Sequence, residues 1–335
     1  MATAACTLQS LMDRAGTAAV IRPVEAADLA SWLGNVNQFR YWQDDLQELR
    51  FDDTLRPQDE PLLRLGAWAP DGGLAGVAEA ALSEDGSRYE DRATGLVGVT
   101  PAYRRHGLGT RLADEVERFA AANGVRWVEA EVRGSNLPVS LPFVRQRGYV
   151  ELERYRTSVQ TPSTVDLSGL TALWSRLQGE GIEIVAFPAI DSPHARDELY
   201  RLTMQIWRDM PREPHVEWQD PSPETFSRSI FERPSVLLDG FFVARDGQRV
   251  VGLSYLARRP DGDAEVGDTG VLRDYRRRGI ARALKMTVTR YAVEHGIERI
   301  HTDNRTDNAG MLAINRELGF VPAEQIVIFE KTLSS

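Results

Sequence analysis

Two arginine- and glycine-rich stretches have the composition of an anion-binding loop. Residues 98–112 read GVTPAYRRHGLGTRL, and residues 270–284 read GVLRDYRRRGIARAL. In each stretch an apolar, strand-like run precedes the arginines and the glycine, and apolar residues at helical spacing follow them. Glycine lets the backbone turn tightly, a helix start leaves N–H groups unpaired, and arginine offers several donors to phosphate oxygens. These residues favour binding of a phosphorylated ligand, and a solvated basic turn is the alternative.

The two stretches belong to a repeat as long as a whole domain. Seven of their fifteen aligned positions are identical. The same offset of 172 positions relates Asn136 to Asn308, and an offset of 171 relates Gly148 to Gly319. Solenoid repeats have periods of roughly 20–50 residues, so this much longer period indicates a duplicated domain.

The order of predicted elements is the same in both copies. Strands alternate with helices, and hairpins come early, which predicts a mixed α/β sheet in each of two tandem domains. Asp246-Gly247, between two apolar runs, is typical of a hairpin turn. Residues 161–181 carry proline, serine and glycine around a short helical stretch. We therefore expect domains at residues 1–160 and 182–335, joined by a linker at 161–181.

The composition restricts the class of protein. The chain has 335 residues, 42% hydrophobic and 27% charged, as in soluble globular proteins. No run approaches the ~18 apolar residues of a membrane span, and the N-terminus lacks a secretory-signal pattern. The single cysteine excludes an intramolecular disulfide, and five scattered histidines predict no metal site. With a net charge of −9, we expect a cytoplasmic monomer or homodimer without nucleic-acid or membrane partners.

Both loops, with the blocks that follow them, resemble the GNAT superfamily of N-acetyltransferases. Residues 104–109 (RRHGLG) and 276–281 (RRRGIA) match that family's acetyl-CoA loop, Gln/Arg-x-x-Gly-x-Gly/Ala. Residues 308–320, NAGMLAINRELGF, closely resemble the family's later Asn-helix-Gly-Phe block, and residues 136–149 do so more loosely. The resemblance covers nearly the whole chain and implies two tandem GNAT domains that use acetyl-CoA as cosubstrate.

The resemblance also implies how the cofactor is held. Backbone N–H groups of the loop cradle the pyrophosphate, the preceding strand splays from its neighbour to pair with the pantetheine arm, and an asparagine begins the helix beside that arm. A simple helix N-cap is the alternative role for this asparagine. In the second copy the corresponding residues are Val271, Arg276, Arg277, Arg278, Gly279, Ile280, Ala281 and Asn308. In the first copy they are Val99, Arg104, Arg105, His106, Gly107, Leu108 and Gly109.

The positions of possible bases favour the second copy as the catalytic one. An alkyl ammonium has a pKa of about 10, so direct acetyl transfer at neutral pH benefits from a base. GNAT members often carry a glutamate six residues before the strand-end valine, which is Glu265 in the second copy and Ala93 in the first. Asp268 is a second carboxylate in the same strand, where the first copy has Leu96. An exposed strand charge is the alternative for both acids.

The family's usual leaving-group acid is missing from both copies. Many members have a tyrosine four residues before the Gly-aromatic pair, where this chain has Asn315 in the second copy and Val144 in the first. Asparagine can donate a hydrogen bond to sulfur but supplies no proton, and a local helix-surface role is its alternative. The roles that remain for the first copy are CoA binding and structural support.

We expect the acetyl acceptor, an amine substrate, to bind over the early helices of the second copy. Aromatic and acidic side chains together suit an amine. The candidates are Trp207, Asp209, His215 and Glu217. A proline-punctuated loop with incidental aromatic residues is the alternative.

The leading hypothesis is an acetyl-CoA-dependent N-acetyltransferase that acts on a primary amine of a small molecule by direct attack. A non-catalytic acyl-CoA-binding or sensing protein is a different class, motivated by the missing tyrosines. Narrower alternatives are mycothiol-synthase-like chemistry, favoured by the tandem layout, and protein N-acetylation.

Overall fold

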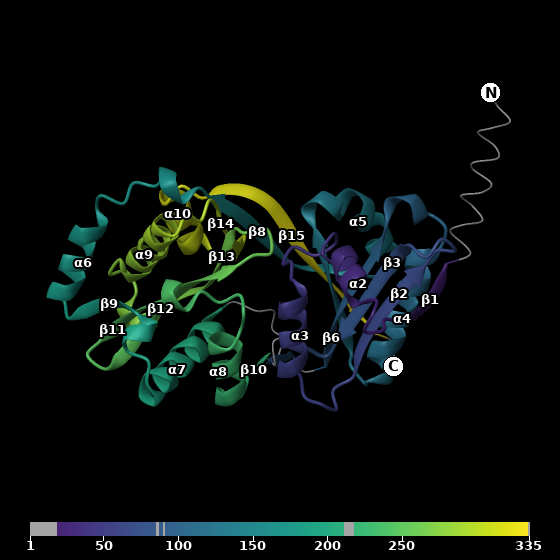
Figure 1. The fold of residues 1–335 in the computed structure, drawn as a ribbon, viewed down its shortest axis with the longest axis horizontal. Coiled ribbons are helices and arrows are strands. Elements are labelled where there is room, and N and C mark those ends of the chain that lie inside the picture. Colours follow the sequence, from purple (N-terminus) through teal and green to yellow (C-terminus); the bar gives the residue numbers. More distant parts are fainter. Residues whose placement is uncertain (1–18, 85–86, 90, 211–217, 334–335) are drawn as a thin grey trace, which may run out of the picture. The chain divides into compact units, whose positions relative to one another are not determined.

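The chain forms two compact units (Figure 1). The computed structural model describes residues 19–84, 87–89, 91–210 and 218–333. The first unit contains the chain up to Arg154 and again from Ile326, and the second contains most of the chain from Tyr155 to Gln325. Each unit holds one copy of the repeated loop. Among the described residues, no helix is long and apolar enough to cross a membrane.

The first unit is a mixed sheet with helices on both faces. Its strands lie in the order β1 (Val20–Pro23), β2 (Leu62–Trp68), β3 (Leu74–Ala81), β6 (Arg92–Val99), β7 (Trp127–Arg133) and β15 (Val321–Thr332). Its described helices are α2 (Leu29–Val36), α3 (Leu46–Leu55), α4 (Leu108–Ala122) and α5 (Leu137–Gln146). Successive β3 residues face opposite sides: Val77 packs in the cluster of Trp32 from α2, and Ala78 in that of Leu108 from α4. The pair β6–β7 is parallel and the other pairs are antiparallel. A separate small sheet contains β4 (Ser83–Glu84), β5 (Ser87–Tyr89) and β10 (Trp218–Gln219).

The second unit repeats this plan. Its strands lie in the order β8 (Val150–Gln160), β14 (Ile300–Arg305), β13 (Ala264–Val271), β12 (Arg249–Arg258), β11 (Phe242–Asp246) and β9 (Ile182–Ala186). Its described helices are α6 (Leu170–Gly179), α7 (Pro193–Asp209), α8 (Pro223–Phe231), α9 (Ile280–Glu294) and α10 (Ala309–Glu317). Figure 1 shows α9 and α10 on one face of this sheet and α7 and α8 on the other. The predicted hairpin turn joins β11 to β12, with Gly247 at φ 58°.

The helix that follows each loop buries the apolar residues that lie at helical spacing, as the sequence predicts, and α9 is buried all round in its middle, from Ala283 to Thr289. In α4 the buried side chains include Leu108, Leu112 and Val116, and in α9 they include Ile280, Leu284 and Val288. Full burial of such a side chain contributes about 1.5–3 kcal/mol. Packing therefore fixes the start of each helix, and with it the position of the preceding loop.

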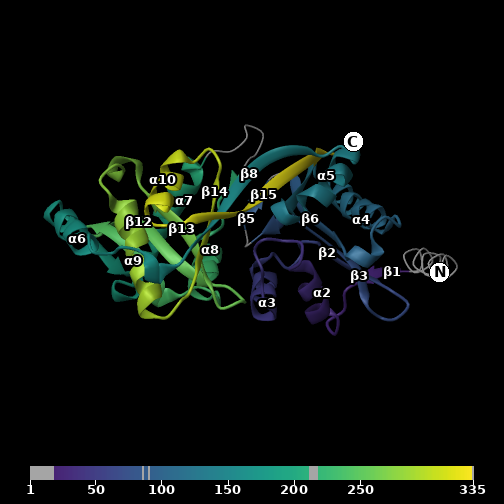
Figure 2. The ribbon, with the colours of Figure 1, turned by 90° about the horizontal axis from the view of Figure 1, so that it is seen from above.

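The final strand of each sequence repeat pairs in the unit that contains the other repeat's loop. β15 follows α10 in the chain, yet its residues from Ile326 to Thr332 pair with β7 in the first unit. β8 follows α5, yet its residues from Tyr155 to Gln160 pair with β14 in the second unit. The yellow β15 and the teal β8 can be followed in Figure 2. The units are therefore not contiguous in sequence, whereas the sequence pattern predicts contiguous domains.

The segment expected to be a linker contains a helix of the second unit. Within residues 161–181, α6 buries Leu170 and Leu177 in the apolar clusters of that unit. The proline, serine and glycine residues that suggested a linker lie around this helix. The segment thus contributes to the core of the second unit as well as connecting the two copies.

A lysine side chain is buried in the second unit. Lys285 of α9 is 1% exposed, and its Nζ lies 5.0 Å from the centre of the Phe320 ring. Burial lowers the pKa of Lys285 from its ordinary value of 10.5 to about 7, and the nearby Asp303 opposes this shift. An unfolded chain binds this proton more tightly than the folded chain. Burying Lys285 therefore lowers stability most below pH 7, and the penalty declines as the pH rises from 7 to 10.5.

Replacing Lys285 by methionine is expected to raise the free energy of unfolding at pH 7 by about 1–3 kcal/mol, because the substitution removes this penalty. The gain should shrink towards pH 10. Urea unfolding at several pH values measures both effects. Lys331, which pairs with Glu117 at 2.7 Å, provides the control, since Lys331→Met should bring no such gain. A loss of stability in Lys285→Met at pH 7 would show instead that the buried ammonium is favourable.

Candidate cofactor and catalytic site

Both repeated loops adopt the same unusual backbone. Arg105 and Arg277 have φ values of 67° and 65°, and Gly107 and Gly279 have values of 79° and 80°. A non-glycine residue in this left-handed region costs about 1 kcal/mol or more and persists where the surroundings impose it, often at ligand sites. Each glycine begins a helix, and neither helix has a side-chain cap. Backbone N–H groups at both helix starts are therefore available to an anion.

The last position of the loop tolerates only a small side chain. A Cβ added to Gly109 would lie 3.5 Å from Val99 and 3.7 Å from Phe143, which is ordinary contact. The second copy has Ala281 at this position. The spacing explains why glycine and alanine are interchangeable here, while a longer side chain would enter the apolar core.

The strand before each loop separates from its parallel neighbour. β13 pairs with β14 only at Ala264 and Glu265, and β6 pairs with β7 only from Arg92 to Gly95. Beyond these pairs the two ladders end, well before the ends of β13 and β6. An extended ligand can pair with the strand backbone in such an opening.

The first arginine of each loop binds the end of that strand. Arg104 donates from Nε to the carbonyl of Val99 at 2.9 Å, and Arg276 donates to the carbonyl of Val271 at 3.0 Å. In each copy this bond ties the loop to the end of the preceding strand.

Asp209 anchors the second loop. It accepts a hydrogen bond from Arg276 at 2.7 Å and pairs with Arg273 at 2.7 Å. The hydrogen bond from Arg273 and the charge of both guanidinium groups lower the pKa of Asp209. The sequence predicts that Asp209 contacts the amine substrate. Asp209 is the last residue of α7, and its two ion pairs join this helix to the loop.

Asp268 lies in a β-bulge of β13. Gly267 and Asp268 lie opposite the single residue Tyr255 of β12, because the pairing register shifts there. Trp207 of α7 donates from Nε1 to Oδ2 of Asp268 at 3.0 Å. Burial raises the pKa of Asp268 to about 6, and the hydrogen bond from Trp207 limits the rise. Such a carboxylate is mostly ionised at pH 7 and is a stronger base than an ordinary aspartate.

Glu265 is in a different environment. It lies at the last β13–β14 pair, beside His301, and accepts a hydrogen bond at 2.8 Å from Arg259, which is 8% exposed. The positive charge of this buried guanidinium group offsets the negative charge of the Glu265 carboxylate. The sequence places Glu265 at the family's glutamate position and Asp268 as a second candidate, whereas the structure shows Glu265 ion-paired and Asp268 with a raised pKa.

Asn315 combines a buried donor that is hydrogen-bonded with a buried acceptor that is not. The residue is 2% exposed, and its Nδ2 donates to Oδ1 of Asn304 at 2.6 Å. Within the described part of the chain, its Oδ1 is buried without a hydrogen-bond partner. Leaving such an atom unpaired costs about 1–3 kcal/mol, and a ligand that donates a hydrogen bond there would recover this energy.

The two helix-starting asparagines differ. Asn308 caps α10, accepting a hydrogen bond from the backbone of Met311 at 3.2 Å. Asn136 makes no such cap, and its Nδ2 donates to the carbonyl of Gln38 at 3.4 Å. Capping is thus the role that the structure gives Asn308.

Comparison with known proteins identifies the family. Residues 27–149 and 198–320 both match the family model described as the Acetyltransferase (GNAT) family, and together these matches span more than half of the chain. The chain belongs to the GNAT family. This confirms the predicted family, the two tandem α/β GNAT domains and the class of N-acetyltransferase.

Curated relatives and solved structures resemble the whole tandem GNAT chain. Mycothiol acetyltransferase of Geodermatophilus obscurus is 26% identical over 325 residues, 92% of each chain. That of Clavibacter michiganensis subsp. michiganensis is 28% identical over 269 residues, 79% of each. A tandem GNAT protein from the clavulanic acid biosynthesis pathway has a TM-score of 0.71 at 16% identity, covering 95% of this chain and 99% of its own. A GCN5-related N-acetyltransferase from Sphaerobacter thermophilus has a TM-score of 0.69 at 19% identity, covering 94% and 95%. The solved structures support the fold.

The two GNAT domains differ at the positions expected to do chemistry. In the first domain, Ala93 is fully buried, Val144 is 7% exposed, and Leu96 packs against the apolar cluster around α2. None of these three side chains can accept or donate a proton. At the positions equivalent to Leu96 and Val144, the second domain has the polar residues Asp268 and Asn315.

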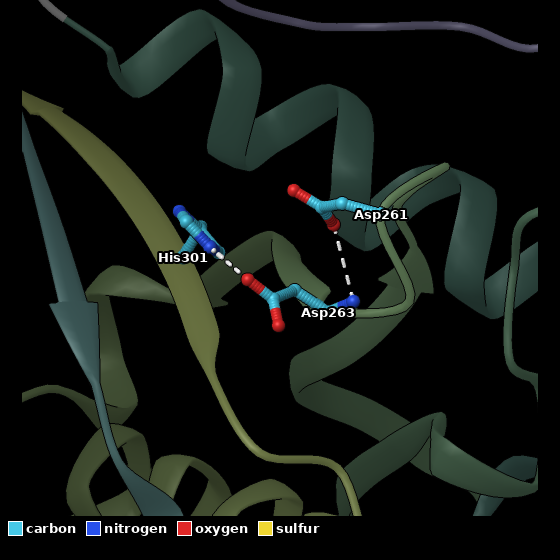
Figure 3. Close-up of side chains that lie close together, drawn as sticks. All are labelled: Asp261, Asp263 and His301. Carbon is cyan, nitrogen blue, oxygen red and sulfur yellow. Dashed lines mark hydrogen bonds and ion pairs between the residues drawn. The ribbon is translucent and has the colours of Figure 1, made fainter.

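One group of side chains in the second GNAT domain has the composition of a metal site (Figure 3). Asp261, Asp263 and His301 lie close together, although the sequence predicts no metal site. Asp263 accepts a hydrogen bond from His301 Nε2 at 2.8 Å and forms an ion pair with Arg299 at 2.9 Å, and Asp261 accepts a hydrogen bond from the Asp263 amide at 3.1 Å. Since cations and donors of the protein already bind these carboxylates, we interpret the group as a structural network.

Two of the residues predicted to bind the amine substrate, His215 and Glu217, lie outside the described residues. Trp207 is described, and besides binding Asp268 it contacts the Phe226 ring edge-to-face at 6.2 Å between centres. Trp207 therefore packs between Phe226 and Asp268.

Proposed function

We propose that this GNAT protein is an acetyl-CoA-dependent N-acetyltransferase whose second domain transfers the acetyl group to a primary amine of a small molecule by direct attack. The observation that carries this proposal is Asp268, a carboxylate with a raised pKa in a bulge of the strand that precedes the cofactor loop. The first domain lacks an ionisable side chain at this position.

Acetyl-CoA would supply an activated thioester and a stable thiol leaving group. The backbone from Arg277 to Ala281, with its left-handed residues and uncapped helix start, suits the pyrophosphate. The opening between β13 and β14 suits the extended arm, and the orphaned Oδ1 of Asn315 suits an N–H or S–H donor. In this proposal Arg276 and Asp209 hold the loop in shape without contacting phosphate.

In the proposed reaction Asp268 takes the proton from the acceptor ammonium, directly or through water, and the free amine attacks the acetyl carbonyl. Trp207 fixes the carboxylate on the side of the sheet that carries α7. Glu265 is less suited to this task, because it would have to leave its pairing with Arg259. Asn315 cannot supply a proton, so the departing thiolate would be stabilised by hydrogen bonds or take, through water, the second proton that the nitrogen loses as the amide forms.

The relatives suggest which acceptor to test first. Several chains called mycothiol acetyltransferase resemble this protein over most of their length. We therefore infer that the amine substrate of mycothiol acetyltransferases is the leading candidate. A panel of primary amines of similar size should accompany it.

Removing the hydrogen bond to Asp268 tests this role through the pH profile. Trp207→Phe is expected to shift the acidic limb of kcat/KM from near pH 6 upwards by about one pH unit, since this hydrogen bond lowers the pKa of Asp268. Initial rates between pH 5 and 9, a range chosen to bracket that limb, measure the shift. Trp174→Phe is the control, because Trp174 donates to Thr287 in the same domain. An acidic limb that stays in place in Trp207→Phe would exclude Asp268 as the titrating group.

A further inference from the structure

The second cofactor loop has an additional guanidinium group that comes from α6. Arg176 donates from Nη2 to the carbonyl of Arg278 at 2.7 Å. The same nitrogen lies 2.9 Å from the place where a Cβ on Gly279 would be. In the first loop, no described atom lies within 4 Å of the equivalent place at Gly107. The two loops thus share a backbone and differ in this neighbouring charge.

A carboxylate holds this guanidinium beside the loop. Glu180 pairs with Arg176 at 2.6 Å and with Arg278 at 3.0 Å. The hydrogen bond from Arg278, assisted by that from Arg176, lowers the pKa of Glu180, so the carboxylate is charged at neutral pH. Two cations share one anion, which leaves an excess positive charge next to the uncapped start of α9.

The arrangement keeps both guanidinium groups accessible. The side chains of Arg176 and Arg278 are 50% and 31% exposed. The backbone of α6 is fixed at the same time, since Leu170 and Leu177 are buried. A guanidinium on a fixed helix loses less freedom on binding than one on a loose tether, and its planar donors match phosphate oxygens.

We propose that Arg176 is a phosphate-binding residue of the second domain and, together with Arg278, contacts the phosphates of CoA. This inference rests on the proposed function, because it assumes that CoA binds at the second loop. The positive charge favours an anion as the occupant of the space beside Gly279. Residues 161–181 would then take part in cofactor binding as well as in the core, and the second loop would bind CoA more tightly than the first.

Calorimetric titration of CoA into the full chain tests this assignment. The site concerned is the one that disappears in Gly279→Glu. For that site, Arg176→Ala is expected to weaken binding about tenfold, and Arg176→Lys less, because lysine keeps the charge and loses the planar donors. Arg201→Ala is the matched control: Arg201 is exposed and pairs with Glu198 three residues away, as Arg176 does with Glu180 four residues away. Arg201→Ala should bind CoA like the wild type.

Pantetheine, which has no phosphate, separates a phosphate contact from a structural effect. Arg176→Ala should bind pantetheine as the wild type does. An equal loss for pantetheine and CoA would overturn the assignment, as would CoA binding in Arg176→Ala that is unchanged or tighter. The absence of CoA binding by the wild type would instead overturn the proposed function, and with it this inference.

Discussion

Replacing Asp268 by asparagine is expected to lower kcat/KM for acetyl transfer by about 100-fold or more, the usual contribution of a general base. The amide has nearly the same shape as the carboxylate and cannot accept the ammonium proton at neutral pH. Because Asp268 lies in the bulge, away from the phosphate-binding loop, the Kd for CoA should change by less than about twofold. Steady-state kinetics with calorimetry of the same variant measures both quantities.

Glu265→Gln is the matched comparison, since it makes the same chemical change three residues away. Its rate should fall much less than that of Asp268→Asn. Its stability should fall more, because the substitution removes the closer of the two carboxylates that pair with the buried guanidinium of Arg259, which lie at 2.8 Å (Glu265) and 3.7 Å (Asp261). If Glu265→Gln loses more activity than Asp268→Asn while remaining folded, the base is Glu265.

Gly279→Glu is expected to remove CoA from the second loop and to lower acetyl transfer by about 100-fold or more. Three effects act together at this position. Its φ of 80° disfavours any side chain, a Cβ would lie 2.9 Å from Nη2 of Arg176, and the added carboxylate would repel phosphate. Calorimetry should find that one binding site is lost, and thermal unfolding should find that the domain remains folded.

Gly107→Glu makes the same change in the first loop, at nearly the same φ of 79°. Any CoA bound by the first loop should be lost, while turnover should fall far less than in Gly279→Glu, because the first domain has Ala93 and Val144 at the positions expected to do chemistry. The reverse ranking of the two variants would assign catalysis to the first domain.

Local chemistry and periodicity made much of this fold predictable. Glycine at a left-handed position, the apolar face of α4 and the Asp246-Gly247 hairpin each depend on a few neighbouring residues, so one sequence contains their signal. The family resemblance supplied the opening between β13 and β14 in the same way, because it rests on the loop motif and its spacing.

Pairings between distant segments could not be predicted in this way. The alternating pattern of a final strand is the same whichever sheet it joins, so the exchange of β8 and β15 leaves no local signal. Similarly, Trp207 reaches Asp268 from α7, 61 residues away in the chain, and Arg176 reaches Gly279 because α6 packs on the second unit. The raised pKa of Asp268 depends on burial among such contacts, which explains why the sequence alone named Glu265 first and Asp268 second.

Acetyl transfer itself is tested most directly by incubating the wild-type chain with acetyl-CoA and the amine panel, including the mycothiol acetyltransferase substrate, and following products by mass spectrometry. We predict one acetylated amine, with one CoA released for each acetyl group transferred. Tight CoA binding at the second loop with no acetylated product from any amine would contradict this account and would indicate a non-catalytic acyl-CoA-binding protein.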